Sequence, residues 1–242
     1  MNKINYKKAF KELIQTSIEN KQYVGLGNPN AKILFIGKEA GMPINSSITH
    51  GSADSWINQN TDYSNRFMPK DNVKNHRHTW QKYQKLFDKI FNKVENRSDK
   101  KEYEITFVEN VFTTELSNLV APTTNKAKQL DGFKTELEKR KKLFWKSEFI
   151  NNFPIVLITA SDNKYIETYP GEVCELFNVS FNKELICAKS DKIWLHYSNT
   201  KTPKIVIHTR QLTNGASNEL IDKISELITE FIKKNSIKIN VK

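Results

Sequence analysis

The sequence predicts an α/β protein with a three-layer α/β/α architecture and a central, mostly parallel four-stranded sheet. Short apolar runs rich in β-branched residues alternate with longer segments of helical periodicity. The apolar runs are nearly continuous, which is typical of parallel strands covered on both faces. The chain has 242 residues, enough to bury one core. We therefore expect a single domain over residues 1–242.

Four segments are expected to form the sheet, because each is a short apolar run bounded by polar residues, Gly or Pro. They are 32–37 (KILFIG), 104–112 (EITFVENVF), 154–160 (PIVLITA) and 204–208 (KIVIH). A short hairpin is expected from residues 185–188 and 193–196.

Apolar residues at helical spacing predict four helices, near 6–18, 80–94, 130–144 and 220–231. Ser217 is the expected N-cap of the last helix. The charged run 138–142 (EKRKK) is expected on the solvated face of the third helix.

Residues 43–78 interrupt this regular alternation. The segment is polar and rich in Asn, Ser and Asp, and connections of this length usually carry function or disorder. Trp56, Tyr63 and Phe67 within it favour an ordered functional loop.

The formal net charge of +11 indicates a polyanionic partner, because neutralising phosphates releases counterions and so drives binding. A lysine-rich surface without such a partner is the alternative. No apolar run is long enough to span a membrane, and the N-terminal segment lacks the apolar core of a signal peptide. We expect a monomer with no membrane association.

The two cysteines, Cys174 and Cys187, indicate a reducing compartment, and we expect a cytoplasmic location. Two thiols cannot supply the four ligands of an all-cysteine iron–sulfur cluster. Together with His196 they lack compact zinc-ligand spacing. We expect neither a metal nor another cofactor.

Polar side chains follow the expected strands at the edge where open α/β sheets bind ligands, beyond the strands' carboxyl ends. The first strand leads to Glu39, the second runs into Asn110 and Glu115, and the fourth ends at His208. A carboxylate can position water and stabilise a cationic, sugar-like transition state. An amide can read the edge of a base, and a neutral imidazole can donate a hydrogen bond to a departing anion.

Each of these residues also has an ordinary structural interpretation. A histidine that ends a strand is more often a structural hydrogen-bonding group, Asn110 could cap a turn, and Glu39 could be a surface charge. The glycines Gly37 and Gly41 do not form a phosphate-binding loop, since no Gly-Lys-Ser/Thr follows. The functional hypothesis depends on the agreement between the strand ends.

These motifs resemble those of the uracil-DNA glycosylase superfamily. The stretch GLGNPNAKILFIGKEAG (25–41) is similar to its first motif, with Glu39 in the place of the catalytic Asp or Asn. VENVFTTEL (108–116) is similar to the second region, where Asn110 matches an Asn that reads the pyrimidine edge. HTRQLT (208–213) looks like the last motif, with His208 on the base-stabilising histidine and Leu212 on the leucine that enters the base stack.

The sequence departs from the family pattern at several positions. Glu39 is one methylene longer than Asp, Ala40 replaces a Pro, and Thr209 and Arg210 replace Pro-Ser. The branch of the family with an iron–sulfur cluster does not fit two cysteines. A larger, modified pyrimidine therefore competes with uracil as the base.

The resemblance implies hydrolysis of the N-glycosidic bond of a base flipped out of DNA. Glu39 would orient water, and His208 would stabilise the leaving base. Arg210 and Thr209 would contact DNA, and Leu212 would fill the vacated stack. Phe67, with Trp56 as second choice, would stack on the base, in a pocket shaped by Asn110, Gly37 and Gly41.

Two other classes of function stay open from the sequence. One is a catalytically silent DNA-binding or damage-sensing module on the same fold. The other is a small α/β enzyme that acts on free nucleotides. The sequence does not distinguish repair from defence against foreign DNA.

Overall fold

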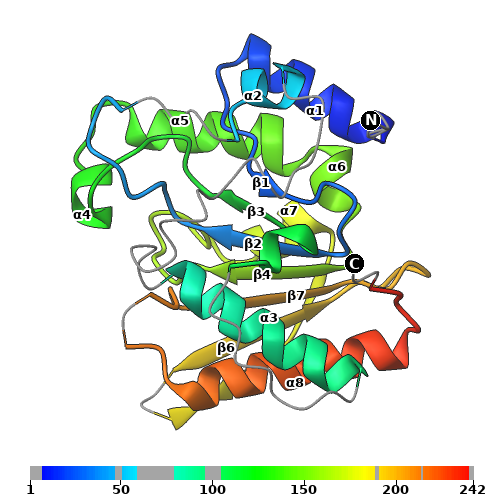
Figure 1. Cartoon of the computed structure of the whole chain (residues 1–242). Helices are drawn as coiled ribbons and strands as arrows, with labels where there is room; N and C mark the ends of the chain where they lie inside the picture. The colour runs from blue at the N-terminus through cyan, green and yellow to red at the C-terminus, as the bar shows by residue number, and fades with distance from the viewer. Residues whose placement is uncertain are drawn as a thin grey trace.

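The computed structural model describes residues 7–46, 51–58, 79–95, 105–188, 191–213 and 215–239. These residues form a mixed α/β fold around one seven-stranded sheet, in the order β1-β3-β2-β4-β7-β6-β5 (Figure 1). The strands are β1 (Leu26–Gly27), β2 (Ile33–Gly37), β3 (Val111–Glu115), β4 (Ile155–Thr159), β5 (Ser180–Ile186), β6 (Lys192–Tyr197) and β7 (Ile205–Thr209). The helices are α1 (Lys8–Glu19), α2 (Ala53–Asn58), α3 (Thr79–Glu95), α4 (Thr124–Ala127), α5 (Phe133–Arg140), α6 (Glu148–Asn151), α7 (Glu172–Phe177) and α8 (Asn218–Lys234).

The centre of the sheet is parallel and its flanks are antiparallel. Strands β3, β2, β4 and β7 run parallel to one another. Strand β1 pairs antiparallel with β3 on one side, and β6 and β5 continue antiparallel from β7 on the other. The sheet is thus larger than the four strands predicted, because the expected hairpin extends it as β5 and β6 and the short β1 adds to its opposite edge.

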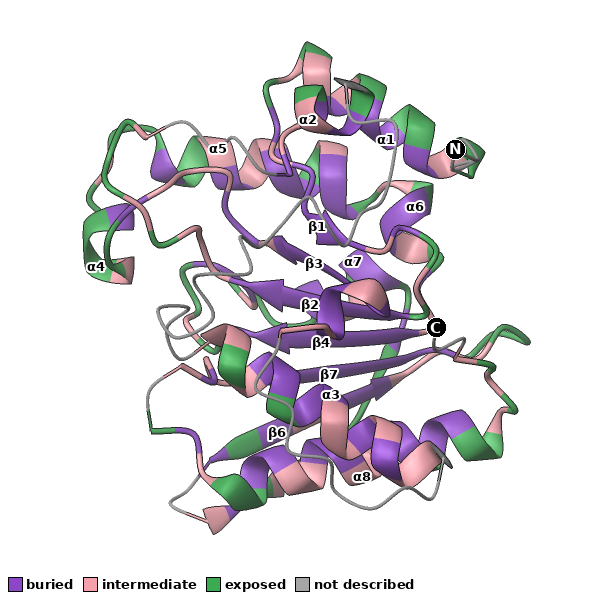
Figure 2. Ribbon diagram, in the orientation of Figure 1, coloured by how far each residue is buried: buried purple, intermediate pink, exposed green. Residues whose placement is uncertain are grey.

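Helices cover both faces of the sheet. Alternate strand residues such as Leu34 and Ile36 pack under α1, α2, α5, α6 and α7. The intervening residues, such as Ile33 and Phe35, pack under α3 and α8. Burial on both faces explains why the central strands β2, β4 and β7 are continuous apolar runs, and these three are buried along their whole length (Figures 1 and 2).

The second predicted strand is displaced along the chain. Residues Phe107–Glu109 form a 3₁₀ turn, and β3 begins only at Val111. The side chain of Gln84 on α3 fixes this turn, because its Oε1 accepts hydrogen bonds from the backbone N–H groups of Thr106 and Phe107, both at 2.8 Å. Phe107 is fully buried by this arrangement. Part of the apolar run that was predicted to be a strand therefore forms a turn that packs under α3.

The third predicted helix is shorter than expected and continues differently. Helix α5 ends at Arg140, a π-helical turn follows over Lys141–Trp145, and α6 comes after it. The charged run 138–142 is not wholly solvated as predicted, because Arg140 is fully buried and Lys141 is 4% exposed. Buried charges of this kind must be paired or hydrogen-bonded, and both are.

Ser217 caps α8 as the sequence predicts, since its Oγ accepts a 3.0 Å hydrogen bond from the N–H of Leu220. Within the described ranges, no helix is both long enough and apolar enough to cross a membrane.

Candidate active site

The connections of the parallel strands diverge at β2 and β4, which are neighbours in the sheet. Strand β2 connects to β3 on one side of it, whereas β3 connects back to β4 on the other side. A crevice at the carboxyl ends of two such strands is the usual ligand site of open α/β folds. Gly37 and Glu39 come from β2 at this point, and Thr159 comes from β4.

Glu39 lies half-buried at the carboxyl end of β2, as predicted from its position in the sequence. Its Oε1 accepts a 2.9 Å hydrogen bond from Thr124 Oγ1. Its Oε2 and the nearby hydroxyl oxygen of Tyr165 are both buried, and neither bonds to any other described residue. Burial raises the pKa of Tyr165, and the hydrogen bond and negative charge of Glu39 raise it further. A buried carboxylate oxygen with so few hydrogen-bond partners is costly.

A second carboxylate, Glu115, ends β3 beside Gly37. Burial raises the pKa of Glu115 to about 8, the negative charge of Glu39 adds to this, and Arg140 opposes it. At neutral pH Glu115 is therefore mostly protonated next to an acidic neighbour. A carboxyl group that keeps its proton at neutral pH can act as a general acid beside a second carboxyl group.

Arg140 holds the strand end that carries Glu115. Its Nε donates to the backbone carbonyl of Glu115 at 2.9 Å, and its two terminal nitrogens donate to the Tyr23 carbonyl and to Thr114 Oγ1. Burial lowers the pKa of Arg140 to about 9, partly offset by the charges near it. It remains a cation at neutral pH, and its positive charge opposes the rise in the pKa of Glu115.

Tyr83 connects α3 to the same sheet edge. Thr159 Oγ1 donates to the carbonyl of Ile36 at 2.9 Å, so it accepts the 2.8 Å hydrogen bond that joins it to the Tyr83 hydroxyl. Burial and the charge of Glu115 raise the pKa of Tyr83. The phenol therefore stays a neutral donor and fixes Thr159 at the carboxyl end of β4.

His208 lies at the carboxyl end of β7, as expected, but its ring is bonded away from Glu39. Its Nε2 is 2.6 Å from the carbonyl oxygen of Ala160, and it lines a separate cavity with Trp194. Burial lowers the pKa of His208 to about 4, so the ring is neutral and Nε2 donates to the carbonyl. The predicted role of His208 beside Glu39 needs correction, because this nitrogen is already bonded.

Of the three DNA contacts predicted after His208, burial rules out Leu212 and Thr209. Leu212 is fully buried in the core under α3 and α8 and is not available as a wedge. Thr209 is fully buried, and its hydroxyl donates to the Lys192 carbonyl at 2.7 Å. Arg210 is partly exposed and forms a 3.0 Å ion pair with the buried Asp191, so its guanidinium helps to order this loop.

Asn110, predicted to recognise the base, lies at the amino-terminal ends of the parallel strands, opposite to the end that carries Glu39. It precedes β3, whereas Glu115 ends it, so the two Cα atoms are about 16 Å apart at a strand rise of about 3.3 Å per residue. The cause is the 3₁₀ turn that displaces the strand. Asn110 is therefore not part of the site around Glu39.

The remaining predicted base contacts have different outcomes. Phe67 lies outside the described residues. Trp56 is 2% exposed and its indole N–H donates to the Gly25 carbonyl at 2.9 Å, so it is a core residue and not a stacking platform. A Cβ at Gly41 would meet nothing within 4 Å, whereas one at Gly37 would collide with the Glu115 carboxylate.

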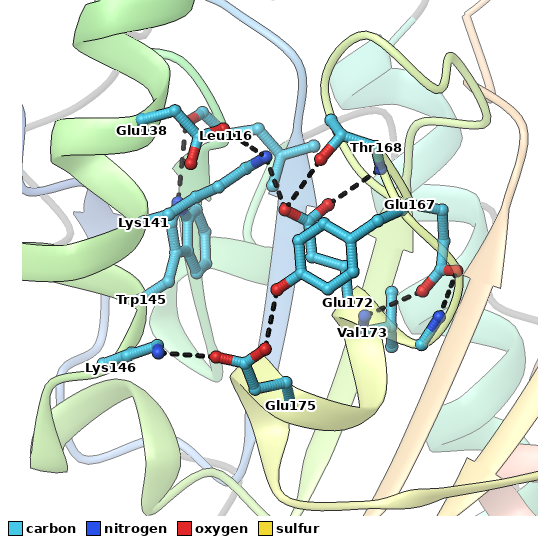
Figure 3. A network of polar contacts seen from close by, with 12 residues as sticks. Leu116, Glu138, Lys141, Trp145, Lys146, Glu167, Thr168, Glu172, Val173 and Glu175 are labelled. Carbon is cyan, nitrogen blue, oxygen red and sulfur yellow. Dashed lines mark hydrogen bonds and ion pairs between the residues drawn. The ribbon is translucent and has the colours of Figure 1, made fainter.

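The loop that carries Tyr165 is held in place by a polar network on α7 (Figure 3). The buried Glu172 accepts a 2.6 Å ion-paired hydrogen bond from Lys141 and bonds from both the N–H and the hydroxyl of Thr168. Glu167 accepts from the N–H groups of Gly171 and Val173. The loop after β4 is thereby attached to the π-helical turn after α5, which gives the site a rigid wall.

Sequence reasoning noted Glu115 at a strand end but did not place it in the site, and it missed Tyr83, Arg140 and Tyr165. Tyr165 follows the third predicted strand, so its position near the carboxyl end of that strand was the signal that could have identified it. Arg140 gave no such signal, because it lies within an ordinary charged run.

Comparisons with protein-family models, curated proteins and solved structures found no match to this chain. Within the part of the chain that the structure describes, no group of three or more His, Cys, Asp or Glu side chains could hold a metal ion.

Proposed function

We propose that the protein is a DNA glycosylase that hydrolyses the N-glycosidic bond of a uracil or modified pyrimidine. The observation that carries this proposal is the pair Glu39 and Glu115, which lie at the carboxyl ends of the neighbouring strands β2 and β3. Glu39 offers a buried carboxylate oxygen beside the Tyr165 hydroxyl, with no other hydrogen-bond partner among the described residues, and Glu115 offers a proton because its pKa is about 8. Hydrolysis of a glycosidic bond needs a carboxylate and an acid in these roles.

In this proposal Glu39 orients a water molecule toward C1′ of the sugar and stabilises the positive charge that develops there. The C1′–N bond breaks and its electron pair leaves with the base. Glu115 donates a proton to the base, and Glu39 accepts the proton released by the water. Glu115 thus replaces His208 as the group that assists departure of the base.

The formal net charge of +11 supports DNA as the substrate. A base inside a duplex must be flipped out before it can reach Glu39, at a cost of about a few kcal/mol. We further propose that the chain acts as a single-domain monomer in the cytoplasm, with the parallel strands as the core of a three-layer arrangement. The two hydrophobic clusters that share one sheet support the single domain.

The test is a panel of single-stranded and duplex oligonucleotides that contain uracil, hypoxanthine or substituted cytosines. Alkali converts each abasic site to a strand break, so excision by the wild type is expected with at least one base and not with unmodified DNA. Excision should slow by at least about 100-fold in Glu39→Gln and persist in Glu12→Gln, whose exposed carboxylate lies on α1. Salt-dependent DNA binding without any excision would favour a silent module, and hydrolysis of free nucleotides alone would favour the small-molecule enzyme.

A further inference from the structure

A second cavity, of about 350 Å³, lies where the antiparallel strands extend the sheet, and the proposed hydrolysis does not use it. Four rings from the sheet line it, those of Phe181, Trp194, His196 and His208. The loop after β4 and helix α7 complete it, with Glu167 and Cys174 among their lining residues. We call this cavity the imidazole pocket.

The four rings are cross-strand neighbours on one face of the sheet. Trp194 pairs with His208, and Phe181 pairs with His196. The ring centroids of the first pair are 4.9 Å apart at an interplanar angle of 38°, and those of the second are 5.6 Å apart at 67°. Such pairs build a continuous surface of aromatic and imidazole rings.

This surface is only partly covered by the protein itself. Phe181 is 55% exposed, and Trp194 is half-buried. The same face of the sheet is covered by several helices near β2, whereas among the described residues that line this cavity the covering ones come from the loop after β4 and from the six-residue helix α7 and its N-cap. Aromatic ring surface beside a cavity is available to stack on another flat ring.

Both imidazoles are neutral, and each has one ring nitrogen bonded to a backbone carbonyl. Nε2 of His208 bonds the Ala160 carbonyl at 2.6 Å, and Nδ1 of His196 bonds the Val206 carbonyl at 3.4 Å. A carbonyl only accepts, so each of these nitrogens carries the hydrogen. Burial lowers the pKa of both rings, which leaves the second nitrogen of each ring unprotonated.

The charge of the imidazole pocket does not suit a phosphate. Among its described lining residues there is a carboxylate, Glu167, but no lysine or arginine. Both oxygens of Glu167 accept backbone hydrogen bonds, from Gly171 and Val173 (Figure 3), so this negative charge is held in place. A phosphate would meet this negative charge without a balancing cation in the lining.

We propose that the imidazole pocket binds an uncharged nucleoside or free nucleobase. The flat ring stacks on Trp194, and its N–H groups donate to the imidazole nitrogens of His196 and His208. The cavity volume is within the range of small-molecule sites, roughly 300–1,000 Å³. This site is separate from the pair Glu39 and Glu115, and the inference does not depend on the proposed hydrolysis.

The test follows the ring Cε1–H signals of the five histidines by NMR while adenosine is added. His196→Gln and His208→Gln assign two of these signals. Adenosine is expected to shift both signals in a saturable manner. N6,N6-dimethyladenosine, which has lost the N–H donors of the amino group, should bind at least about 10-fold more weakly. AMP should also bind more weakly than adenosine.

Two substitutions separate stacking from general damage. Trp194→Phe keeps a flat ring and should keep most of the adenosine affinity, whereas Trp194→Leu should lose about 10-fold or more. Tyr169 is exposed on the loop after β4, and its ring does not line the pocket. The variant Tyr169→Leu should therefore bind adenosine as the wild type does. Melting temperatures show which variants are folded.

The proposal is overturned if no nucleoside shifts these two signals, or if adenosine and its dimethyl analogue bind equally. Binding of choline alone would also overturn it, because that would mark a site for quaternary ammonium groups. Repeating the titration with Glu39→Gln separates the two proposals. Nucleoside binding without excision by the wild type supports the imidazole pocket and refutes the hydrolysis. Excision without nucleoside binding supports the hydrolysis and refutes the imidazole pocket.

Discussion

Gly37 and Glu115 lie opposite each other in the parallel register of β2 and β3, and the Glu115 carboxylate occupies the space that a side chain at position 37 would need. Because Gly37 has no side chain, the carboxylates of Glu39 and Glu115 can both lie at the carboxyl ends of these two strands. Glu39 follows two residues later, and its charge contributes to the raised pKa of Glu115.

We expect Gly37→Ala to displace the Glu115 carboxylate. The excision rate should fall by about 10-fold or more, because a misplaced acid loses its alignment with the leaving group. Gly41→Ala is the matched control, since a Cβ there would meet nothing within 4 Å. The two variants are compared in excision rate and melting temperature, and equal rates would show that the position of Glu115 does not matter.

Glu115→Gln should change how stability depends on pH. The pKa of Glu115 is raised by folding, so the folded state holds a proton that the unfolded state releases. Stability is then lost as the pH rises from the unfolded pKa of about 4.3 toward 8. The substitution removes this loss, so the stability of the variant should stay nearly level from pH 5 to 8, where that of the wild type falls. Urea unfolding of both proteins from pH 5 to 8 measures it, and parallel curves would contradict the buried, protonated carboxyl.

The pKa of His208 is lowered by folding, which has the opposite consequence. The folded state holds the ring neutral, so stability should fall as the pH drops from the unfolded pKa of about 6.5 toward 4. Titration of the ring signals by NMR should place His208 near 4. A midpoint at the ordinary value would show an exposed ring that is not bonded to Ala160.

The ion pair between Lys141 and Glu172 should be important for stability, whereas that between Lys146 and Glu175 should not. Both join the π-helical turn to α7, but the first is buried, with 4% and 1% of the side chains exposed, and the second is about half exposed. Lys141→Met leaves a buried carboxylate without its cation and should cost about 3–5 kcal/mol. Lys146→Met should have no measurable effect. Similar losses in chemical denaturation would mean that burial does not set the strength of these pairs.

The sequence predicted the parts of the fold that depend on local hydrophobic pattern. Three parallel strands, the helices α1, α3 and α8, and the Ser217 cap follow from apolar spacing and capping chemistry, and the position of Glu39 at a strand end follows from the first of these strands. The second strand was misplaced because Gln84, far away in the sequence, holds part of that run as a turn.

The candidate site was less predictable because it depends on contacts between distant elements. Arg140 belongs to a run of charges that looks solvated, yet it is buried beneath the end of β3. Leu212 looks like a wedge in its motif but packs into the core under α8. Because β3 begins only at Val111, Asn110 lies before this strand and not near its carboxyl end. Pattern alone cannot distinguish these outcomes, since each is decided by tertiary packing.

The most direct test of the central claim is the single-turnover excision rate of Glu39→Gln, measured beside its affinity for the same oligonucleotide. Glu39→Gln keeps the shape of the side chain and removes the charge that is needed mainly in the transition state. We expect a rate at least about 100-fold below that of the wild type and of Glu12→Gln, with DNA affinity unchanged. An unchanged rate, or a loss of rate matched by an equal loss of affinity, would contradict a catalytic role for Glu39.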